Sequence, residues 1–231
     1  MREIVLDTET TGFEPSEGHR IVEIGAVELF NHMPTGRTYH QYINPERDMP
    51  TEAFNVHGLS EDFLRGHPVF RAVGQAFVDF VGDARLIIHN AAFDIKFLNF
   101  ELGRIGLTHL DWGRVTDTLA MARRKFPGSP ASLDALCRRF GVDNSAREKH
   151  GALLDSEILA EVYLELIGGR QPDLVLAPAG PVTKGPVVTD TDWRPRPRPA
   201  PLPSRLTAEE SAAHAAFLDG MGDAAIWKKL L

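Results

Sequence analysis

Residues 4–12 constrain the fold and the chemistry of this chain more than any other stretch. The segment opens with a short apolar run of the kind that forms a buried strand, and it then places Asp7 and Glu9 two positions apart. In a strand, side chains at positions i and i+2 point to the same face, so both carboxylates project together. A hard divalent cation with oxygen ligands would neutralise them. The pattern therefore indicates a metal site, although a solvated acidic strand end would have the same sequence.

The composition limits the kinds of protein that this chain can be. Its 231 residues are 43% hydrophobic, which suffices for one domain with a sizeable core and an appendage. A formal net charge of −7 excludes a general polyanion-binding surface, so nucleic acid would have to be bound through metals and local contacts. The single cysteine, Cys137, excludes an internal disulfide and is typical of the reducing cytoplasm. We expect no export signal and no membrane span.

The spacing of apolar residues predicts a mixed α/β domain. Strands over residues 20–30 and 39–43 follow the first strand closely enough to form an antiparallel meander, with Glu23 and Glu28 facing solvent or the sheet edge. Residues 55–60 are expected to form a turn. The helical segments and later strands are predicted at 68–81 (helix), 85–89 (strand), 91–103 (helix capped by Asn90), 115–118 (short strand or turn), 118–124, 133–140 and 152–167 (helices).

Three further side chains are candidates for the site of Asp7 and Glu9. Asp94 falls in the first turn of the helix after Asn90, where an acid is also favoured by the helix dipole alone. Asp155 lies early in the last helix among apolar neighbours, and His150 precedes that helix. Four carboxylates together predict two divalent cations, which suit an in-line attack on phosphorus. A histidine, whose ordinary pKa is close to neutral, can take the proton of the attacking water.

Three motifs resemble those of the DEDDh 3′–5′ exonucleases, a family with a ribonuclease H-like fold. They are residues 7–12 (DTETTG), residues 89–94 (HNAAFD), and His150 followed by Asp155 after four residues, and the likeness covers residues 2–169. The resemblance implies that Asp7, Glu9 and Asp155 hold one Mg²⁺ or Mn²⁺. It implies that Asp7 bridges to a second ion, which Asp94 binds through water, and that His150 is the general base.

The same resemblance implies a binding site for the 3′-terminal nucleotide. Thr10 and Thr11 would hold this nucleotide through backbone and side chain. Its base and sugar would pack against Val56, His57 and Phe93, and Asn90 would orient the site.

The composition changes beyond residue 170, where the exonuclease-like domain (1–170) is expected to end. Residues 171–205 are rich in proline and contain four arginines in their second half, which predicts a flexible linker. Residues 206–231 predict a docking helix that begins with a capping box of Thr207 and Glu210.

Within the family, residues 55–60, residues 88–94 and the tail resemble the proofreading subunits of bacterial replicative DNA polymerases. In that group the tail binds the catalytic (alpha) subunit of the polymerase, which implies contacts from Phe217, Leu218 and Trp227. Gln171, Leu174 and Leu176 resemble a binding motif for the sliding clamp.

We therefore predict a metal-dependent exonuclease that removes mispaired nucleotides from a frayed 3′ DNA end as part of a cytoplasmic bacterial replicative polymerase. Unpairing costs least at a mismatch, so selectivity would come from access to the site. A stand-alone RNA-trimming exonuclease would use the same chemistry, and a non-catalytic adaptor would keep the fold without activity. The linker and tail favour the first hypothesis over the second, and the presence of all five key side chains argues against the third.

Overall fold

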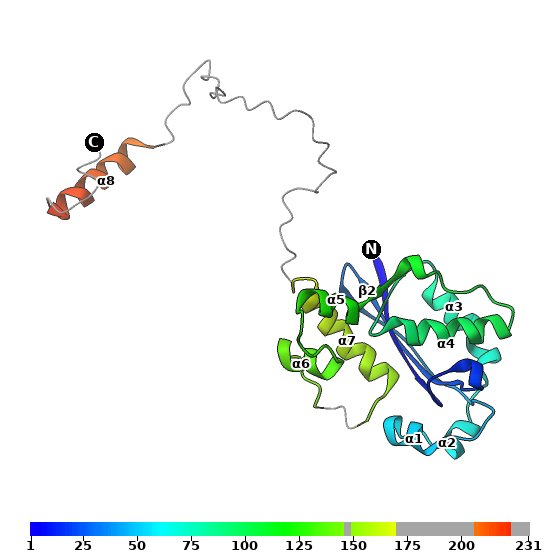
Figure 1. The fold of residues 1–231 in the computed structure, drawn as a ribbon. Helices are drawn as coiled ribbons and strands as arrows, with labels where there is room; N and C mark the ends of the chain where they lie inside the picture. The colour runs from blue at the N-terminus through cyan, green and yellow to red at the C-terminus, as the bar shows by residue number, and fades with distance from the viewer. Residues whose placement is uncertain (146–148, 170–205, 223–231) are drawn as a thin grey trace, which may run out of the picture. The chain divides into compact units, whose positions relative to one another are not determined.

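The structure is a computed structural model that describes residues 1–145, 149–169 and 206–222 (Figure 1). The chain divides into two units, residues 1–176 and 177–231. The predicted linker over residues 171–205 lies outside the described residues, and so do Gln171, Leu174, Leu176 and Trp227. Within the described ranges, no helix is both long enough and apolar enough to cross a membrane.

A five-stranded mixed sheet forms the centre of the first unit, with strand order β3-β2-β1-β4-β5. The strands are β1 (Arg2–Thr10), β2 (Ile21–Phe30), β3 (Met33–Tyr42), β4 (Arg85–Ile88) and β5 (Val115–Asp117). The first three form the predicted antiparallel meander, whereas β4 pairs parallel to β1 and β5 pairs parallel to β4. The carboxyl ends of β1, β4 and β5 therefore meet at one edge of the sheet, where α/β proteins place their ligands.

Helices flank this mixed sheet on both faces, which is the arrangement of the ribonuclease H-like fold that the resemblance implies (Figure 1). The helices of the first unit are α1 (Thr51–His57), α2 (Glu61–Arg65), α3 (Phe70–Val81), α4 (Ala91–Arg104), α5 (Thr118–Lys125), α6 (Leu133–Phe140) and α7 (Ala152–Leu166), with short 3-10 turns at Pro15–Glu17 and Trp112–Arg114. The second unit contains α8 (Ala208–Gly220), whose predicted capping box is present at Thr207 and Glu210.

Alternation along β1 divides the core into two layers. Ile4 and Leu6 are fully buried in the cluster that α3 and α4 cover, and Val5 is fully buried in the cluster that α7 covers. This is the period of two that a strand buried on both faces requires. A third cluster joins α5 and α6 to the outer side of α7 and contains Cys137, which is 1% exposed. The lone cysteine is therefore a core residue, as expected.

Helix α7 begins directly over Gly25 of β2. A Cβ atom at Gly25 would lie 2.1 Å from the backbone of Ala152 and of Leu153, so only glycine allows this approach. One helical turn after Ala152, the hydroxyl of Ser156 donates to the carbonyl oxygen of Gly25 at 2.9 Å. The close packing fixes the height of the first turn of α7 above the sheet, and this turn carries Asp155.

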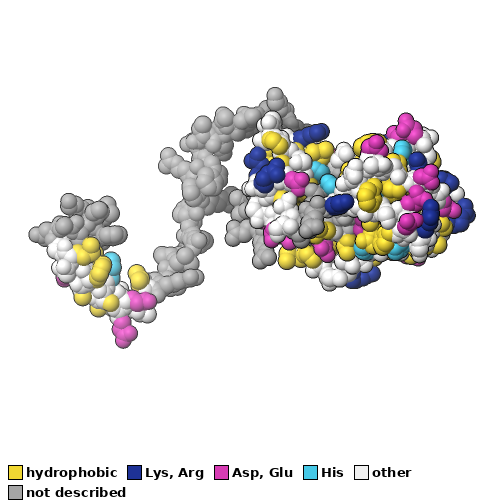
Figure 2. Space-filling view, turned by 90° about the horizontal axis from the view of Figure 1, so that it is seen from below, with side chains coloured by type: hydrophobic (Ala, Val, Ile, Leu, Met, Phe, Trp, Pro, Cys, Tyr) yellow, Lys and Arg dark blue, Asp and Glu magenta, His cyan; other side chains and the backbone are white. Residues whose placement is uncertain are grey.

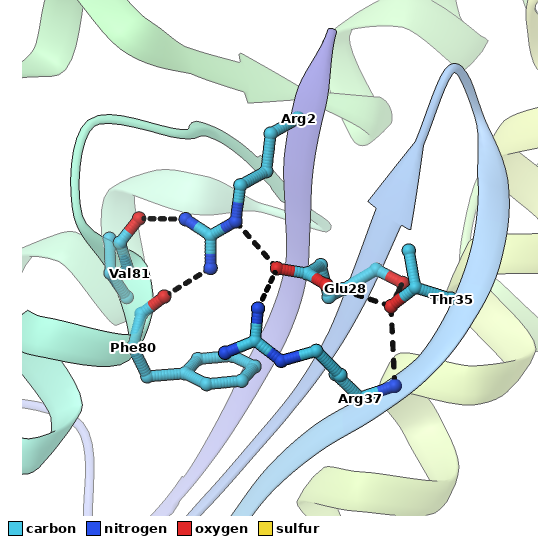
Figure 3. Close-up of polar contacts among 6 residues, drawn as sticks. All are labelled: Arg2, Glu28, Thr35, Arg37, Phe80 and Val81. Atoms are coloured by element: carbon cyan, nitrogen blue, oxygen red, sulfur yellow. Dashed lines mark hydrogen bonds and ion pairs between the residues drawn. The ribbon is translucent and has the colours of Figure 1, made fainter.

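The prediction that Glu28 faces solvent or the sheet edge is wrong, because its side chain is held in a buried polar network (Figure 3). Arg2 and Arg37 both bind its Oε1 atom, at 2.5 and 2.9 Å, and Arg2 also donates to the carbonyl oxygen of Val81 at 2.8 Å. Burial raises the pKa of Glu28, but the hydrogen bonds from Arg2 and Thr35 outweigh this effect and hold it below its usual range. The network joins the sheet to the end of α3.

Three other local predictions differ from the structure. Glu23 is also buried rather than exposed, and its carboxylate lies 2.7 Å from Nε2 of His40. The first part of the predicted turn at residues 55–60 is the end of α1, which stops at Gly58 because this residue has a φ of 76° and caps the helix. Asn90 precedes α4 as expected, but it has a φ of 64° and its side chain makes no capping hydrogen bond.

Candidate active site

The carboxyl edge of the sheet borders a cavity of about 580 Å³, and all five predicted catalytic residues line it. Asp7 and Glu9 come from the end of β1, and Asp94 comes from the first turn of α4. Asp155 lies in the first turn of α7, and His150 lies just before that helix. The structure therefore brings together side chains that are up to 148 positions apart in the chain.

Glu9, His150 and Asp155 form the tightest group in this cavity. One ligand atom from each of the three lies within 4.8 Å of the others, and Nδ1 of His150 is 3.2 Å from Oδ2 of Asp155. Both carboxylates are buried, at 8% and 3% exposed, whereas the His150 side chain is 49% exposed. Buried carboxylate oxygens that converge in this way match the oxygen ligands that Mg²⁺ and Mn²⁺ prefer.

Asp94 is anchored to β1, the strand that carries Asp7 and Glu9. Its Oδ1 accepts hydrogen bonds from the backbone N–H and the hydroxyl of Thr8, at 3.1 and 2.7 Å. Burial raises the pKa of Asp94 to about 7, although both Thr8 bonds act in the opposite direction. A buried carboxylate held among other acids is costly in the protein alone, and a bound cation would relieve that cost. The residues present thus fit a divalent-cation site.

The turn before α4 is locked to the neighbouring turn before α5. The Asn90 N–H donates to Oδ1 of Asp117 at 3.2 Å, and the same oxygen caps α5 by accepting from the N–H of Leu119. In addition, Nδ1 of His89 lies 2.9 Å from the hydroxyl of Thr118. Asp117 is therefore a helix cap. The two linked turns fix the start of α4, and Asn90 is exposed at the wall of the cavity.

A second cavity of about 380 Å³ adjoins the first, because Thr8, Glu9 and Phe93 line both. Its walls come from the turn after β1 and from α1. The cavity brings together every predicted substrate residue except Asn90: Thr10, Thr11, Val56, His57 and Phe93. The contacts that the resemblance implies for these residues stay predictions, but the structure places them around one space beside the acids.

His57, which is 5% exposed, is one of the buried polar residues that line this second cavity. Its Nδ1 accepts a hydrogen bond from the N–H of Leu59 at 3.0 Å, so the neutral ring carries its proton on Nε2. The pKa of His57 is lowered to about 4, mainly by burial; a hydrogen bond with the backbone of Thr10 opposes this shift, and the nearby charges of Lys149 and His150 add to it. The ring therefore stays neutral near pH 7 and presents an N–H donor.

The turn after β1 is held by its own side chains. The Thr10 hydroxyl donates to the carbonyl oxygen of Gly12 at 2.6 Å, and the Thr11 hydroxyl accepts from the N–H of Arg20 at 3.0 Å. A Cβ atom at Gly12 would lie 2.3 Å from the His19 ring, so any other residue there would require this ring to move. This rigid turn presents Phe13, which is 81% exposed, at the second cavity.

Sequence reasoning missed several residues that line the two cavities, among them Thr8, Phe13 and Arg123. Thr8 could have been suspected, since a hydroxyl between two acids is a natural hydrogen-bond partner for a third. The signal for Phe13 was an aromatic side chain directly after a glycine turn. Arg123, on α5, lines the first cavity. No pattern in the linear sequence connects Arg123 with the acids.

Comparison with known proteins identifies the family. The family model described as Exonuclease (RNase_T) matches residues 4–163. The protein named DNA polymerase III subunit epsilon from Rickettsia conorii is 59% identical over 174 residues, which are 74% of this chain and 76% of that protein. The protein of the same name from Escherichia coli is 44% identical over 238 residues, 98% of this chain and 97% of that protein.

The chain belongs to the DNA polymerase III epsilon subunit family. This epsilon family member is a 3′–5′ exonuclease, as the motifs predict. Solved structures confirm the ribonuclease H-like fold. The nuclease domain of 3′hExo, a DEDDh family member bound to rAMP, has a TM-score of 0.60 at 21% identity, with 71% of this chain and 90% of that chain covered. An apo structure of exonuclease I has a TM-score of 0.61 at 16% identity, with 72% and 41% covered.

Proposed function

We propose that this epsilon subunit removes mispaired 3′-terminal nucleotides from DNA within a bacterial replicative polymerase in the cytoplasm, where it works on the nucleoid. The observation that carries the proposal is the joining of two cavities: the lining of the first includes the four predicted acids and His150, and the lining of the second includes Val56 and Phe93. The first has the groups that hydrolyse a phosphodiester, and the second has room beside them for the terminal nucleoside.

Asp7, Glu9 and Asp155 would hold one divalent cation, and Asp7 with Asp94 would hold a second, the cations being Mg²⁺ or Mn²⁺. When bound, such ions lower the pKa of the attacking water and stabilise the leaving oxygen. In this site the four carboxylates would bind and orient the ions. The zinc-bound structure of the exonuclease I–ssDNA complex from Escherichia coli supports metal use in this fold.

His150 accepts the proton of the attacking water. Its ring is half exposed, so it can pass the proton on to solvent, and Asp155 at 3.2 Å orients it through Nδ1. The water oxygen bonds to the phosphorus of the terminal nucleotide while the bond from phosphorus to the upstream 3′-oxygen breaks. The upstream oxygen then takes a proton, and the product is a nucleoside 5′-monophosphate.

The second cavity receives the terminal nucleoside. Val56 and Phe93 pack against its base and sugar, the Nε2–H of His57 is a donor to it, and Thr10 and Thr11 shape the wall that it contacts. The base must leave the duplex to enter this space, and leaving costs least where it is mispaired. Selectivity for mismatches thus follows from access, while Asn90 orients the site beside the phosphate.

The tail attaches the enzyme to its polymerase. In α8, Phe217 is 66% exposed and Leu218 is 7% exposed, and Trp227 lies outside the described residues. We propose that the tail binds the polymerase catalytic (alpha) subunit and that residues 171–176 bind the sliding clamp. Tethering replaces intrinsic affinity for DNA with a high effective concentration, which suits a chain with a net charge of −7.

Hydrolysis of matched and mismatched primers tests this function. The full-length protein in Mg²⁺ should release nucleoside 5′-monophosphates from the 3′ end, faster from a mismatch, and EDTA should stop the release. Faster trimming of an RNA strand of the same sequence would instead favour a stand-alone RNA exonuclease. For the tail, Phe217→Ala should weaken co-elution with the polymerase catalytic subunit, whereas His214→Ala, on the same exposed helix, is the matched control.

A further inference from the structure

One wall of the first cavity is built by α5 and the start of α6. Leu119 and Arg123 line it from α5, where they lie one turn apart on the same face. Leu133 and Asp134 line it from α6, so this wall carries one carboxylate as well as the guanidinium. Among the described residues that line this cavity, Arg123 is the only lysine or arginine. Arg123 therefore shares this cavity with the predicted catalytic acids and, unlike Thr8, Glu9 and Phe93, does not line the second cavity.

The two helices that form this wall are cationic in an otherwise acidic chain. Their charged residues are Arg123, Arg124 and Lys125 at the end of α5, Asp134 at the start of α6, and Arg138 and Arg139 at its end. Figure 2 shows dark blue side chains at the end of the domain where Figure 1 places α6. Of these cations, Lys125 donates to the carbonyl oxygen of Leu166 at 2.9 Å, and Arg139 stacks 4.3 Å from the Phe126 ring.

The arrangement of the cavities sets the direction in which the substrate strand must leave. If the terminal nucleoside occupies the second cavity and its phosphate lies beside the acids, the rest of the strand departs over the remaining wall. That wall is α5 and α6, and a nucleic-acid backbone presents a phosphate to it. Arginine binds phosphate through two parallel hydrogen bonds, which lysine cannot do.

We propose that Arg123 binds the phosphate immediately upstream of the scissile one and that α5 and α6 form the exit path of the substrate strand. Arg138, one helical turn beyond Asp134 on the same face of α6, is the next cation along this path. The inference rests on the proposed function, because it assumes which cavity holds the terminal nucleoside. It assigns Arg123 a role in holding the strand rather than in the bond-breaking step.

Two substrates separate strand binding from chemistry. One is a single-stranded oligonucleotide, and the other is the p-nitrophenyl ester of thymidine 5′-monophosphate, in which p-nitrophenolate replaces the whole upstream strand. For Arg123→Gln in the full chain, we expect the KM for the oligonucleotide to rise about tenfold with kcat nearly unchanged. The slope of log KM against log salt should fall by about 0.7. Hydrolysis of the ester should not change, and Arg123→Lys should restore part of the salt slope.

Arg124→Gln is the matched control. Arg124 is exposed and does not line the cavity, and its substitution removes the same charge from the neighbouring position. Three results would each overturn the proposal. They are an equal loss of activity on both substrates in Arg123→Gln, an unchanged KM of this variant for the oligonucleotide, and an equal rise of KM in Arg124→Gln. If the unmodified protein hydrolysed neither substrate, the proposed function would fail and this inference with it. If the unmodified protein hydrolysed both, failure of the Arg123 prediction would leave the proposed function intact.

Discussion

The Asp94 carboxylate on α4 accepts two hydrogen bonds from Thr8 on β1, at 3.1 Å from its backbone N–H and at 2.7 Å from its hydroxyl. These residues are 86 positions apart in the chain, and both bonds are buried. The contact ties the first turn of α4 to the strand that carries Asp7 and Glu9. It holds the carboxylate at the cavity although burial raises its pKa to about 7.

Asp94→Asn should therefore stabilise the metal-free protein while abolishing exonuclease activity. A carboxyl group whose pKa is higher in the folded than in the unfolded state stabilises the fold at low pH, and this stabilisation is lost between about pH 4 and 7. Asparagine keeps an oxygen acceptor for Thr8 and removes the charge. We expect the free energy of unfolding in EDTA at pH 8 to rise on the order of 2 kcal/mol. Urea unfolding measures it, and a less stable variant would contradict the explanation.

His57 should remain neutral well below pH 6. Its pKa of about 4 lies under the ordinary value of 6.5, so the unfolded chain takes up the proton first. The contribution of a neutral His57 to stability is thus complete above about pH 6.5 and is lost as the pH falls toward 4. NMR titration of the ring should give a midpoint near 4, and His57→Gln should remove this part of the pH dependence of unfolding. A midpoint near 6.5 would show that the ring is not buried as described.

Gly25→Ala should damage both stability and activity, because α7 has no space for a Cβ atom there. Displacing the start of α7 would move Asp155 and His150 away from Glu9. We expect unfolding to be easier by about 1–3 kcal/mol and the exonuclease rate to fall. Gly66→Ala is the control, since the nearest atom to its Cβ is 3.7 Å away and Gly66 has an ordinary φ of −79°. Equal effects of both substitutions would contradict this account of α7.

His150→Ala should lower the rate of the chemical step by about 10²–10⁴-fold while leaving Mn²⁺ affinity largely unchanged. The ring is half exposed, and its absence removes the proposed proton acceptor but none of the four proposed carboxylate ligands. Single-turnover cleavage measures the rate of the chemical step, and Mn²⁺ titration of the same variant measures its affinity for the metal. A parallel loss of metal affinity would make His150 a ligand rather than the base.

Sequence reasoning predicted most helices and strands and the four acids that line one cavity, because local patterns mark both. The run before Asp7 predicted a buried strand, and the spacing of Asp7 and Glu9 predicted a shared face. It failed where a contact between distant segments decides the outcome. Glu28 is buried because Arg2 and Arg37 neutralise it, and neither arginine is marked by its neighbours in sequence. Residues 55–57 form the last turn of α1, and the turn that the sequence predicted begins only at Gly58, which ends this helix.

The central claim is that acids from β1, α4 and α7 act as one metal-dependent centre. Single-turnover cleavage of a 3′-mismatched primer by the full-length Asp155→Ala variant, in Mg²⁺ and in Mn²⁺, tests it most directly. Asp155 is 3% exposed and lies 3.2 Å from His150. In the proposed mechanism its loss removes both a metal ligand and the group that orients the base. The account predicts that cleavage by this correctly folded variant falls to the level seen in EDTA. Cleavage at the unmodified rate would contradict it.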